Sequence, residues 1–386
     1  MFELSKRLKQ LPPYLFVEID KAKREARKQG RDIIDLGVGD PDQPTPRHII
    51  SSLNTAALDP ANHRYALDQG MPVLRQAIAR WYKKRFNVIL DPESEILPLI
   101  GSKEGLAHFP LAFLNNGDYS LIPDPCYPPY KGGTIIAGAK PFLMPLLKNN
   151  DFLPDLKKIP LSARKKAKLI YINYPNNPTS AVAGEDFYRQ VLGFARKNKA
   201  IVVSDLAYSE LAYDGYKPKS FLETGGAKDV AIEFHSLSKT YNMTGWRIGW
   251  ACGNSRLVSA LAKVKSNLDS GIFQAIQAAG VSALETPAEE AEGICGLYQQ
   301  RRDVLVPGLK SLGFEFEVPK ATFYLWIRTP HKTSSVDFSK TILDRADIVV
   351  TPGVGFGKYG EGYIRMALTV PEERIVEALS RLKKVI

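Results

Sequence analysis

The sequence predicts an α/β protein in which a large domain with a mainly parallel sheet is joined to a smaller α+β domain. Between about residues 46 and 283, short runs rich in β-branched residues alternate with longer helical stretches, which is typical of a parallel sheet covered by helices. After residue 284 the pattern changes to one long helix followed by short strands. The length of 386 residues has room for about two or three domains.

The expected strands of the large domain are short apolar runs, each ending near a polar residue or a glycine. They are EILPLIG (95–101), YSLIPD (119–124), AKLIYINY (167–174), AIVVSD (200–205), DVAIEFHS (229–236) and IGWACG (248–253). Helices are expected between them over 71–86, 103–114 and 183–198. Open α/β sheets bind ligands beyond the carboxyl ends of their strands, so chemistry is expected in the residues that follow each strand.

The smaller domain is predicted to combine both ends of the chain. A long helix over 286–312 precedes FEFEV, TFYLWIR, DIVV and GYIRMAL, an antiparallel-looking set that is closed by a helix from Pro371. Residues 1–45 are too few to fold alone and are expected to pack there as well. We therefore assign residues 46–283 to the large domain, and residues 1–45 and 284–386 to the small one.

Composition excludes several classes of protein. A content of 44 % hydrophobic and 24 % charged residues is that of a globular chain, not a disordered one. No apolar run reaches the ~18 residues that span a bilayer, and the N-terminus lacks the apolar core of a signal peptide. Neither the three cysteines nor the five histidines are spaced as metal ligands. We expect a cytoplasmic, metal-free protein with no membrane partner.

The net charge of +11 raises the alternative of a surface that binds nucleic acid or another polyanion. The basic residues form short clusters at 21–31, 162–168 and 382–384, and the first and last have the apolar spacing of amphipathic helices. Solvated helix faces are therefore the favoured interpretation. No aromatic-interleaved basic stripe and no Cys/His finger supports a polyanion site, so no nucleic-acid partner is expected.

The segment SLSKTYNMTGWR (236–247) carries the strongest chemical signal. Ser236, Ser238 and Arg247 follow an expected strand, and two hydroxyls with a guanidinium suit a phosphate monoester. Lys239 lies among them, where desolvation and nearby cations lower the pKa of an amine and make it reactive toward carbonyl carbons. A phosphate beside an aldehyde-reactive lysine indicates pyridoxal phosphate. The alternative is a surface loop rich in Ser and Lys.

Polar residues after other strands would complete such a site. Asp205 ends the run AIVVSD, where a carboxylate can bond a pyridine nitrogen, and Tyr208 can bond the ring oxygen. Asn177 presents an amide in the turn NYPNNPT. Taken alone, each has a plain structural explanation, a helix cap for Asp205 and a turn for Asn177.

Two further segments add an anion site and an aromatic ring. In GSKEG (101–105) the amides of Ser102 and Lys103 open a helix whose dipole favours an anion. In DPCYPPY (124–130), Tyr127 lies between prolines, and its ring can stack on an aromatic cofactor. Together, these features after different strands favour the pyridoxal phosphate site over the surface loop.

In this order the motifs resemble the class I and II aminotransferases of fold type I, which use pyridoxal phosphate. The resemblance covers nearly the whole chain, through GVGDP (37–41), RYALDQG (64–70), GSKEG, DPCYPPY, NYPNNPT, SDLAYSEL, HSLSKTYNMTGWRIGW and YIRMAL (363–368). It implies a seven-stranded, mainly parallel sheet, and a homodimer with shared active sites. It also implies ping-pong transfer of an amino group between an amino acid and a 2-oxo acid. HSLSKTYNMTGWRIGW, the early PPYLF and GVGDP most resemble the LL-diaminopimelate aminotransferase subfamily.

The resemblance also assigns roles to the matching positions. Lys239 would bond covalently to the cofactor and later shuttle a proton, and Asp205 would pair with the pyridine nitrogen. Tyr127 would stack on the ring, and Asn177 and Tyr208 would bond its oxygen. The phosphate would be bound by Ser102, Lys103, Ser236, Ser238, Arg247 and, from the neighbouring subunit, Tyr65. The substrate would be bordered by Tyr14, Gly39, Lys103, Tyr127, Asn177 and Arg365, the last of which would bind the α-carboxylate.

Some positions depart from the family pattern or mimic another one. Residue 180 is Ser where many relatives have Gly after Asn-Pro-Thr. The stretch SNLDSGIFQAIQ (266–277) has no match to an asparagine with which some diaminopimelate enzymes contact the partner's substrate. GFGKYG (355–360) matches GxGxxG, but a strand is expected after it, so we interpret it as a glycine loop that leads to Arg365.

Three rival functions concern the substrate and the reaction. An alanine, aspartate or aromatic aminotransferase would use the same residues for a different donor. A β-lyase would use the same fold and cofactor, and would release pyruvate without an oxo-acid acceptor. A nucleic-acid-binding regulator would retain the cofactor pocket without being an enzyme.

Overall fold

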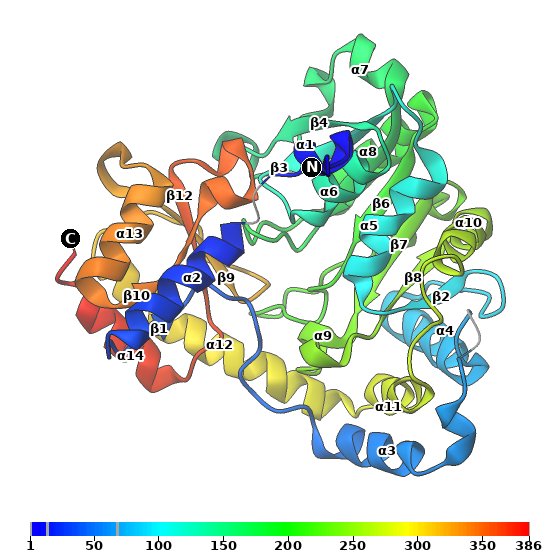
Figure 1. Cartoon of the computed structure of the whole chain (residues 1–386), viewed down its shortest axis with the longest axis horizontal. Coiled ribbons are helices and arrows are strands. Elements are labelled where there is room, and N and C mark those ends of the chain that lie inside the picture. The colour runs from blue at the N-terminus through cyan, green and yellow to red at the C-terminus, as the bar shows by residue number, and fades with distance from the viewer. Residues whose placement is uncertain (1, 13–14, 67–68, 386) are drawn as a thin grey trace.

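The computed structural model describes the chain except residues 1, 13–14, 67–68 and 386, and except the side chains of 15–19. Its largest sheet has seven strands in the order β2-β8-β7-β6-β5-β3-β4. A three-stranded sheet (β11-β12-β9) and a two-stranded one (β1-β10) form the rest. In Figure 1 the large sheet and its helices occupy one side of the molecule, and the two small sheets occupy the other.

The large sheet confirms the predicted mainly parallel architecture. Its strands are β2 (Ile96–Leu99), β3 (Tyr119–Asp124), β4 (Lys140–Pro145), β5 (Ala167–Asn173), β6 (Ile201–Asp205), β7 (Ala231–Ser236) and β8 (Gly249–Gly253). Only β8 runs antiparallel to its neighbours, β2 and β7. β4 is not among the expected strands. It contains Pro141 and Pro145, and it pairs only with β3, at an edge of the sheet that tolerates proline.

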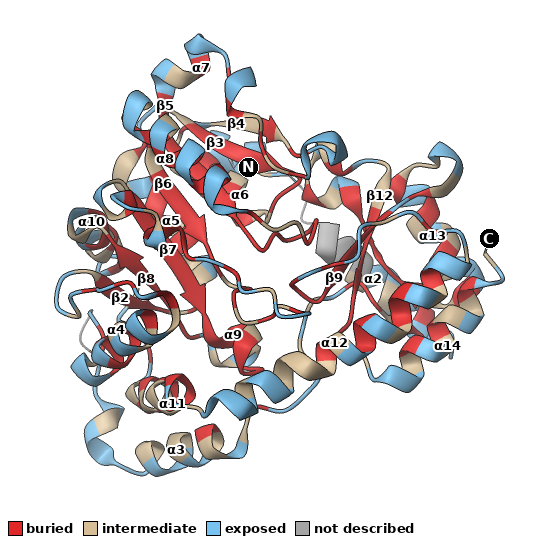
Figure 2. Cartoon of the chain, turned by 180° about the vertical axis from the view of Figure 1, so that it is seen from behind, coloured by how far each residue is buried: buried red, intermediate tan, exposed pale blue. Residues whose placement is uncertain are grey.

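Helices cover both faces of this sheet. The helices of this part of the chain are α3 (Arg47–Ala57), α4 (Pro72–Phe86), α5 (Ser102–Phe113), α6 (Pro129–Ile136), α7 (Leu161–Lys166), α8 (Glu185–Asn198), α9 (Leu237–Thr240), α10 (Ser255–Lys265) and α11 (Gln274–Leu284). Among them α3 packs against α11 and not against the sheet, and α9 directly follows the end of β7. One apolar layer joins α4 and α8 to the sheet through residues such as Ile78 and Val191, and the other joins α5 and α10 through Phe109 and Leu261. Figure 2 shows the strands between them as buried.

The remaining elements form or cover the small sheets, with one exception. They are α12 (Ala288–Ser311), β9 (Tyr324–Arg328), α13 (Ser335–Ala346), β10 (Ile348–Val349), β11 (Thr351–Pro352), β12 (Tyr363–Ala367) and α14 (Glu372–Leu382), with α2 (Leu15–Lys28) and β1 (Ile34–Asp35) from the N-terminal part. The exception is α1 (Lys6–Gln10), which packs against α6 of the large sheet. None of the helices in the described part of the chain is long and apolar enough to cross a membrane.

Two expectations for these strands are wrong. FEFEV forms no strand; only Phe316 bridges to Ile327, and Pro319 soon after has no N–H with which to extend the pairing. Within DIVV only Ile348 and Val349 form a strand, β10, which pairs in parallel with β1 instead of joining an antiparallel set. TFYLWIR and GYIRMAL do pair antiparallel, as β9 and β12. The domain boundaries near residues 45 and 284 stay a prediction.

Candidate active site

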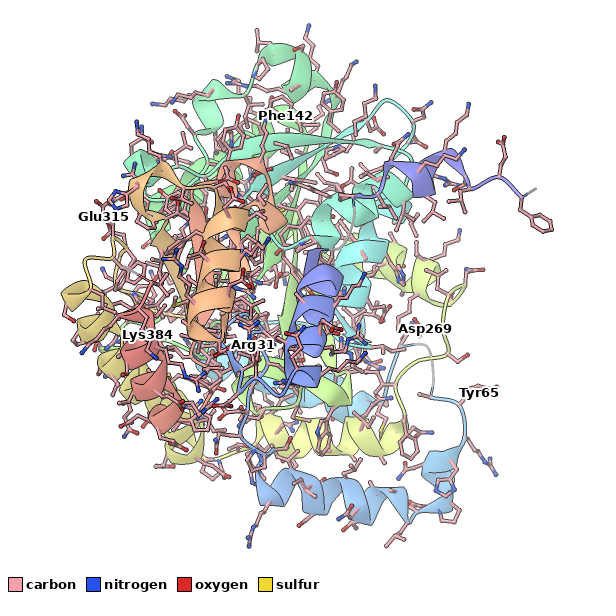
Figure 3. The ribbon with its side chains drawn as sticks, turned by 60° about the vertical axis from the view of Figure 1, so that its left-hand side comes forward. Arg31, Tyr65, Phe142, Asp269, Glu315 and Lys384 are labelled. Carbon is pink, nitrogen blue, oxygen red and sulfur yellow. The ribbon has the colours of Figure 1, made fainter. Side chains whose placement is uncertain are left out.

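A cavity of about 240 Å³ lies at the carboxyl ends of the parallel strands, where they face β9 and β12. The motifs that predicted the site meet here: its lining includes Gly39, Ser102, Lys103, Tyr127, Asn177, Asp205, Tyr208, Ser236, Ser238, Lys239, Arg247 and Arg365. Tyr65 is not among the lining residues and is 87 % exposed, at the edge of the molecule in Figure 3. Tyr14 lies outside the described residues.

Lys239 enters the cavity from α9, the short helix that directly follows β7. The Ser236 hydroxyl begins that helix by accepting a hydrogen bond from the Ser238 N–H (3.1 Å). The Lys239 amine donates to the main-chain oxygen of Gly39 (2.8 Å). Burial lowers the pKa of Lys239 to about 8, with Arg365 and Arg247 acting in the same direction against Asp40. A neutral, nucleophilic amine is therefore accessible near physiological pH.

Asp205 ends β6 and is only 4 % exposed. Its carboxylate accepts hydrogen bonds from the Tyr130 hydroxyl (2.6 Å) and the Ala207 N–H (3.3 Å). Burial raises the pKa of Asp205 to about 6, against the lowering effect of the Tyr130 bond. Within the described residues no basic side chain forms an ion pair with this carboxylate. A buried carboxylate with that surrounding suits a cationic N–H group from a ligand.

The other end of the cavity suits an anion. Ser102 is the first residue of α5, whose N-terminal amides and dipole favour negative charge. Gly101 precedes it with φ 73°, and a Cβ there would lie 2.2 Å from Nη2 of Arg247. The glycine therefore lets the guanidinium approach the start of the helix. Arg247 also donates to the main-chain oxygen of Thr244 (2.7 Å).

Arg365 forms a third part of the wall, on β12. Its guanidinium donates to Oδ1 of Asn177 and to the main-chain oxygen of Gly37, both at 2.8 Å. It packs over the rings of Tyr324 and Phe356, at 4.1 and 4.6 Å from their centres. An arginine fixed in plane in this way is suited to bidentate binding of a carboxylate.

Sequence reasoning missed several lining residues, namely Val38, Asn173, Ala207, Thr244, Tyr324 and Phe356. Asn173 could have been found, because it lies one residue before the end of the predicted strand 167–174; in the structure it ends β5 and is the register partner of Asp205. Phe356 lies in the GFGKYG loop, which forms short 3-10 turns as a glycine loop should. Tyr324 lies inside an apolar strand pattern that predicts core, and nothing in the sequence marks it as different.

A family model for aminotransferase class I and II matches residues 31–382. The chain belongs to the class I and II aminotransferases. It is 55 % identical over 383 residues to the LL-diaminopimelate aminotransferases of Syntrophobacter fumaroxidans and Aquifex aeolicus, with 99 % of each chain covered in both comparisons. It is 52 % identical over 382 residues to that of Moorella thermoacetica, covering 99 % of this chain and 98 % of the relative.

Solved structures support the fold of this aminotransferase. Substrate-bound BacF from Bacillus subtilis has a TM-score of 0.96 at 37 % identity, with 100 % of this chain and 98 % of that one covered. A probable N-succinyldiaminopimelate aminotransferase from Thermus thermophilus has a TM-score of 0.91 at 38 % identity, over 96 % and 100 % of the two chains. A mutant Thermus thermophilus aspartate aminotransferase reaches 0.93 at 29 % identity over both whole chains. The predicted family and fold type I architecture are confirmed.

Class I and II aminotransferases use pyridoxal phosphate, which confirms the predicted cofactor. The residues of this aminotransferase fit it. Lys239 offers an amine of lowered pKa, Asp205 a buried carboxylate that lacks a basic partner among the described residues, and Arg247 a guanidinium at a helix start. The roles of the individual residues stay predictions.

The substitution Asp205→Asn tests whether this carboxylate is held for the cofactor. In cofactor-free protein the variant should be at least as stable as the wild type, because a charge that burial disfavours is removed. As burial raises the pKa of Asp205 to about 6 from 3.8, ionisation costs the folded state increasingly between pH 4 and 6. The advantage of the variant in thermal unfolding should therefore grow over that interval.

The same variant should bind pyridoxal phosphate about ten-fold or more weakly, measured by visible absorbance at equilibrium. Unfolding at lower temperature at every pH, together with unchanged cofactor affinity, would make Asp205 a purely structural carboxylate.

The pKa of Lys239 predicts a pH dependence for cofactor uptake. Only the neutral amine attacks an aldehyde, and with a pKa of about 8 its neutral fraction rises about ten-fold between pH 7 and 9. The rate at which cofactor-free protein gains visible absorbance should rise accordingly. Asp40→Asn is the matched control, because removing the carboxylate that raises the pKa of Lys239 should move the profile to lower pH. A rate that does not change between pH 7 and 9 would contradict the role of Lys239 as the amine that attacks the cofactor aldehyde.

Proposed function

We propose that this aminotransferase moves an amino group from LL-2,6-diaminopimelate to 2-oxoglutarate by a ping-pong reaction in lysine biosynthesis. The products are glutamate and an oxo acid that cyclises, with loss of water, to tetrahydrodipicolinate. The observation that carries the proposal is the identity of 52 to 55 % over nearly the full length to relatives named LL-diaminopimelate aminotransferase. We infer that the enzyme works in the cytoplasm.

The solved relatives that bear other names are less similar, at 29 to 38 % identity. That difference in identity favours diaminopimelate as the amino donor over alanine, aspartate or an aromatic amino acid. The positions that would read the distal end of the donor are not identified by any contact within one chain, so a donor panel decides between these substrates.

In this proposal each polar residue of the cavity has its own role in the reaction. Pyridoxal phosphate, once bound, supplies a ring that withdraws electrons from the substrate's α-carbon. Lys239 takes and returns the proton at that carbon, since a pKa of about 8 lets its amine hold or release one near neutral pH. Asp205 provides the negative charge that keeps a proton on the ring nitrogen. Arg247 and the start of α5 hold the phosphate group.

Substrate orientation falls to Arg365 and its neighbours. The guanidinium binds the α-carboxylate, which both the amino acid and the 2-oxo acid possess, so one group serves both halves of the reaction. Asn177 fixes Arg365 through the 2.8 Å bond to its Nη1. Orientation of this kind supplies part of the rate enhancement, because it removes rotational freedom before the proton is transferred.

The donor and the lysine can be tested together by spectroscopy. LL-diaminopimelate alone should bleach the visible band of the loaded wild-type enzyme, and 2-oxoglutarate should restore it. Lys239→Ala should fold as the wild type does and lose at least about a thousand-fold in turnover, because no other amine replaces it.

Several results would contradict the proposal. An active Lys239→Ala enzyme would reject the mechanism. If only alanine, aspartate or an aromatic amino acid bleached the visible band, the donor would be that amino acid and not LL-diaminopimelate. Release of pyruvate without an acceptor would indicate a β-lyase, and a shifted DNA band at moderate salt would favour the regulator.

We further propose that two copies form a homodimer in which Tyr65 of each subunit reaches the phosphate site of the other. The support is that Tyr65 lies in the motif RYALDQG but is 87 % exposed and does not line the cavity of its own chain. A tyrosine so exposed leaves most of its ring in water unless another surface covers it.

Mixing two inactive variants tests this shared site. Lys239→Ala subunits retain Tyr65, and Tyr65→Ala subunits retain Lys239, so a mixed dimer has one complete site. After subunit exchange, random pairing should restore about a quarter of the wild-type activity. The absence of any recovery, with exchange verified by mass, would place Tyr65 outside the partner's site.

A further inference from the structure

Tyr324, the first residue of β9, lines the cavity but belongs to none of the motifs that predicted the site. Its side chain is 2 % exposed. Its hydroxyl lies 3.0 Å from the hydroxyl of Tyr208, and Cζ of Arg365 lies 4.1 Å from the centre of its ring. On a third side, a Cβ on Gly39 would lie 2.0 Å from the Tyr324 hydroxyl. One side chain thus contacts three residues of the proposed site.

We propose that Tyr324 is a positioning residue that orients the Tyr208 hydroxyl and the Arg365 guanidinium, and that Ser180 holds Tyr324 in place. The inference rests on the proposed function, because it takes Tyr208 to bond the cofactor ring and Arg365 to bind the α-carboxylate.

The contact with Tyr208 acts on its hydrogen bonding. A phenol that donates its proton to a ring oxygen can still accept one, and the Tyr324 hydroxyl is at hydrogen-bond distance. In the loaded enzyme Tyr324 therefore donates to Tyr208. A donor whose own oxygen accepts a hydrogen bond is strengthened, so Tyr324 makes Tyr208 a better donor to the ring.

The contact with Arg365 acts on its orientation. The face of an aromatic ring attracts a guanidinium, and more strongly in a desolvated site such as this one, where Arg365 is 2 % exposed. The ring lies against a group that is also bonded to Asn177 and Gly37. Together these contacts fix the plane of the guanidinium, which bidentate binding of a carboxylate requires.

Ser180 holds the main chain of Tyr324. Its hydroxyl donates to the main-chain oxygen of Tyr324 (2.6 Å) and lies 2.9 Å from Oγ1 of Thr322. That same Oγ1 accepts from the Tyr324 N–H (3.1 Å). Both main-chain polar groups of Tyr324 are thereby tied to hydroxyls next to the turn that carries Asn177. Ser180 therefore links Tyr324 to the turn that carries Asn177, and both Tyr324 and Asn177 contact Arg365.

The backbone at Ser180 gives a reason to regard this bond as functional. Ser180 is buried and has a φ of 59°, in the left-handed region that glycine adopts without strain. Glycine at this position would relieve the strain but could not bond to Tyr324. The serine therefore retains a strained backbone together with two contacts that only a hydroxyl makes here.

Two substitutions at Tyr324 separate its two contacts in the loaded enzyme. Tyr324→Phe keeps the ring and removes the hydroxyl, so the pH midpoint of the visible band should rise by about half a unit or more, with KM changed less than about two-fold. Tyr324→Leu removes the ring, so KM for both donor and acceptor should rise about ten-fold, with a smaller change in kcat.

Each contact has its own contradicting result. An unchanged or lower midpoint in Tyr324→Phe would overturn the link to Tyr208, and an unchanged KM in Tyr324→Leu would overturn the link to Arg365. A wild-type enzyme that never acquires the visible band would overturn the proposed function and this inference with it, whereas a normal wild-type band with unchanged variants would overturn this inference alone.

Ser180→Ala and Ser180→Gly form a matched pair of variants that tests whether the Ser180 hydroxyl holds Tyr324 in place. Both lose the hydroxyl, so both should raise KM by a similar factor of about three or more. The glycine variant should nevertheless unfold at a higher temperature than the alanine variant, because it relieves the positive φ. A wild-type KM in a folded Ser180→Gly enzyme would show that the hydroxyl does not position Tyr324.

Discussion

The cofactor side of the site depends on the parallel register of β5, β6 and β7. Asn173 pairs with Asp205, and Asp205 pairs with Phe234, so the three strands end at one edge. The turn after β5, the segment after β6 and helix α9 after β7 all begin there. β8 runs the other way and therefore starts at this edge, which brings Arg247 to it, and β2, antiparallel to β8, ends there and delivers Ser102. Sheet pairing alone thus gathers groups from five strands.

The cavity keeps opposite charges buried without pairing them with each other. Burial lowers the pKa of Lys239 and raises that of Asp205, so in both cases the charged form is disfavoured. Such an arrangement costs folding free energy, and a domain tolerates it where a ligand restores the missing interactions. The rest of the fold, with apolar layers on both faces of the sheet, compensates for that cost.

The sequence was sufficient for the strands and for the parts of the site that follow them, because apolar runs and strand-end polar residues are local patterns. It was insufficient where tertiary contacts decide. β4 forms despite Pro141 and Pro145 because it lies at an edge, and FEFEV fails to form a strand although its residue types favour one. Tyr324 has the pattern of a core residue, and only its contacts with Tyr208 and Ser180, in the segments that follow β6 and β5, place it at the cavity.

Residues on the cavity wall are less free to be substituted during evolution than the exposed residues around the cavity. On the wall Asn177 is bonded to Arg365, and behind it Ser180 is bonded to Tyr324, so a substitution here disturbs a partner in a distant part of the chain. An exposed residue outside it can change without such a penalty. New substrate preferences should therefore arise outside the wall while the chemistry is inherited unchanged. This pattern agrees with solved relatives that keep TM-scores of 0.91 to 0.96 under different names.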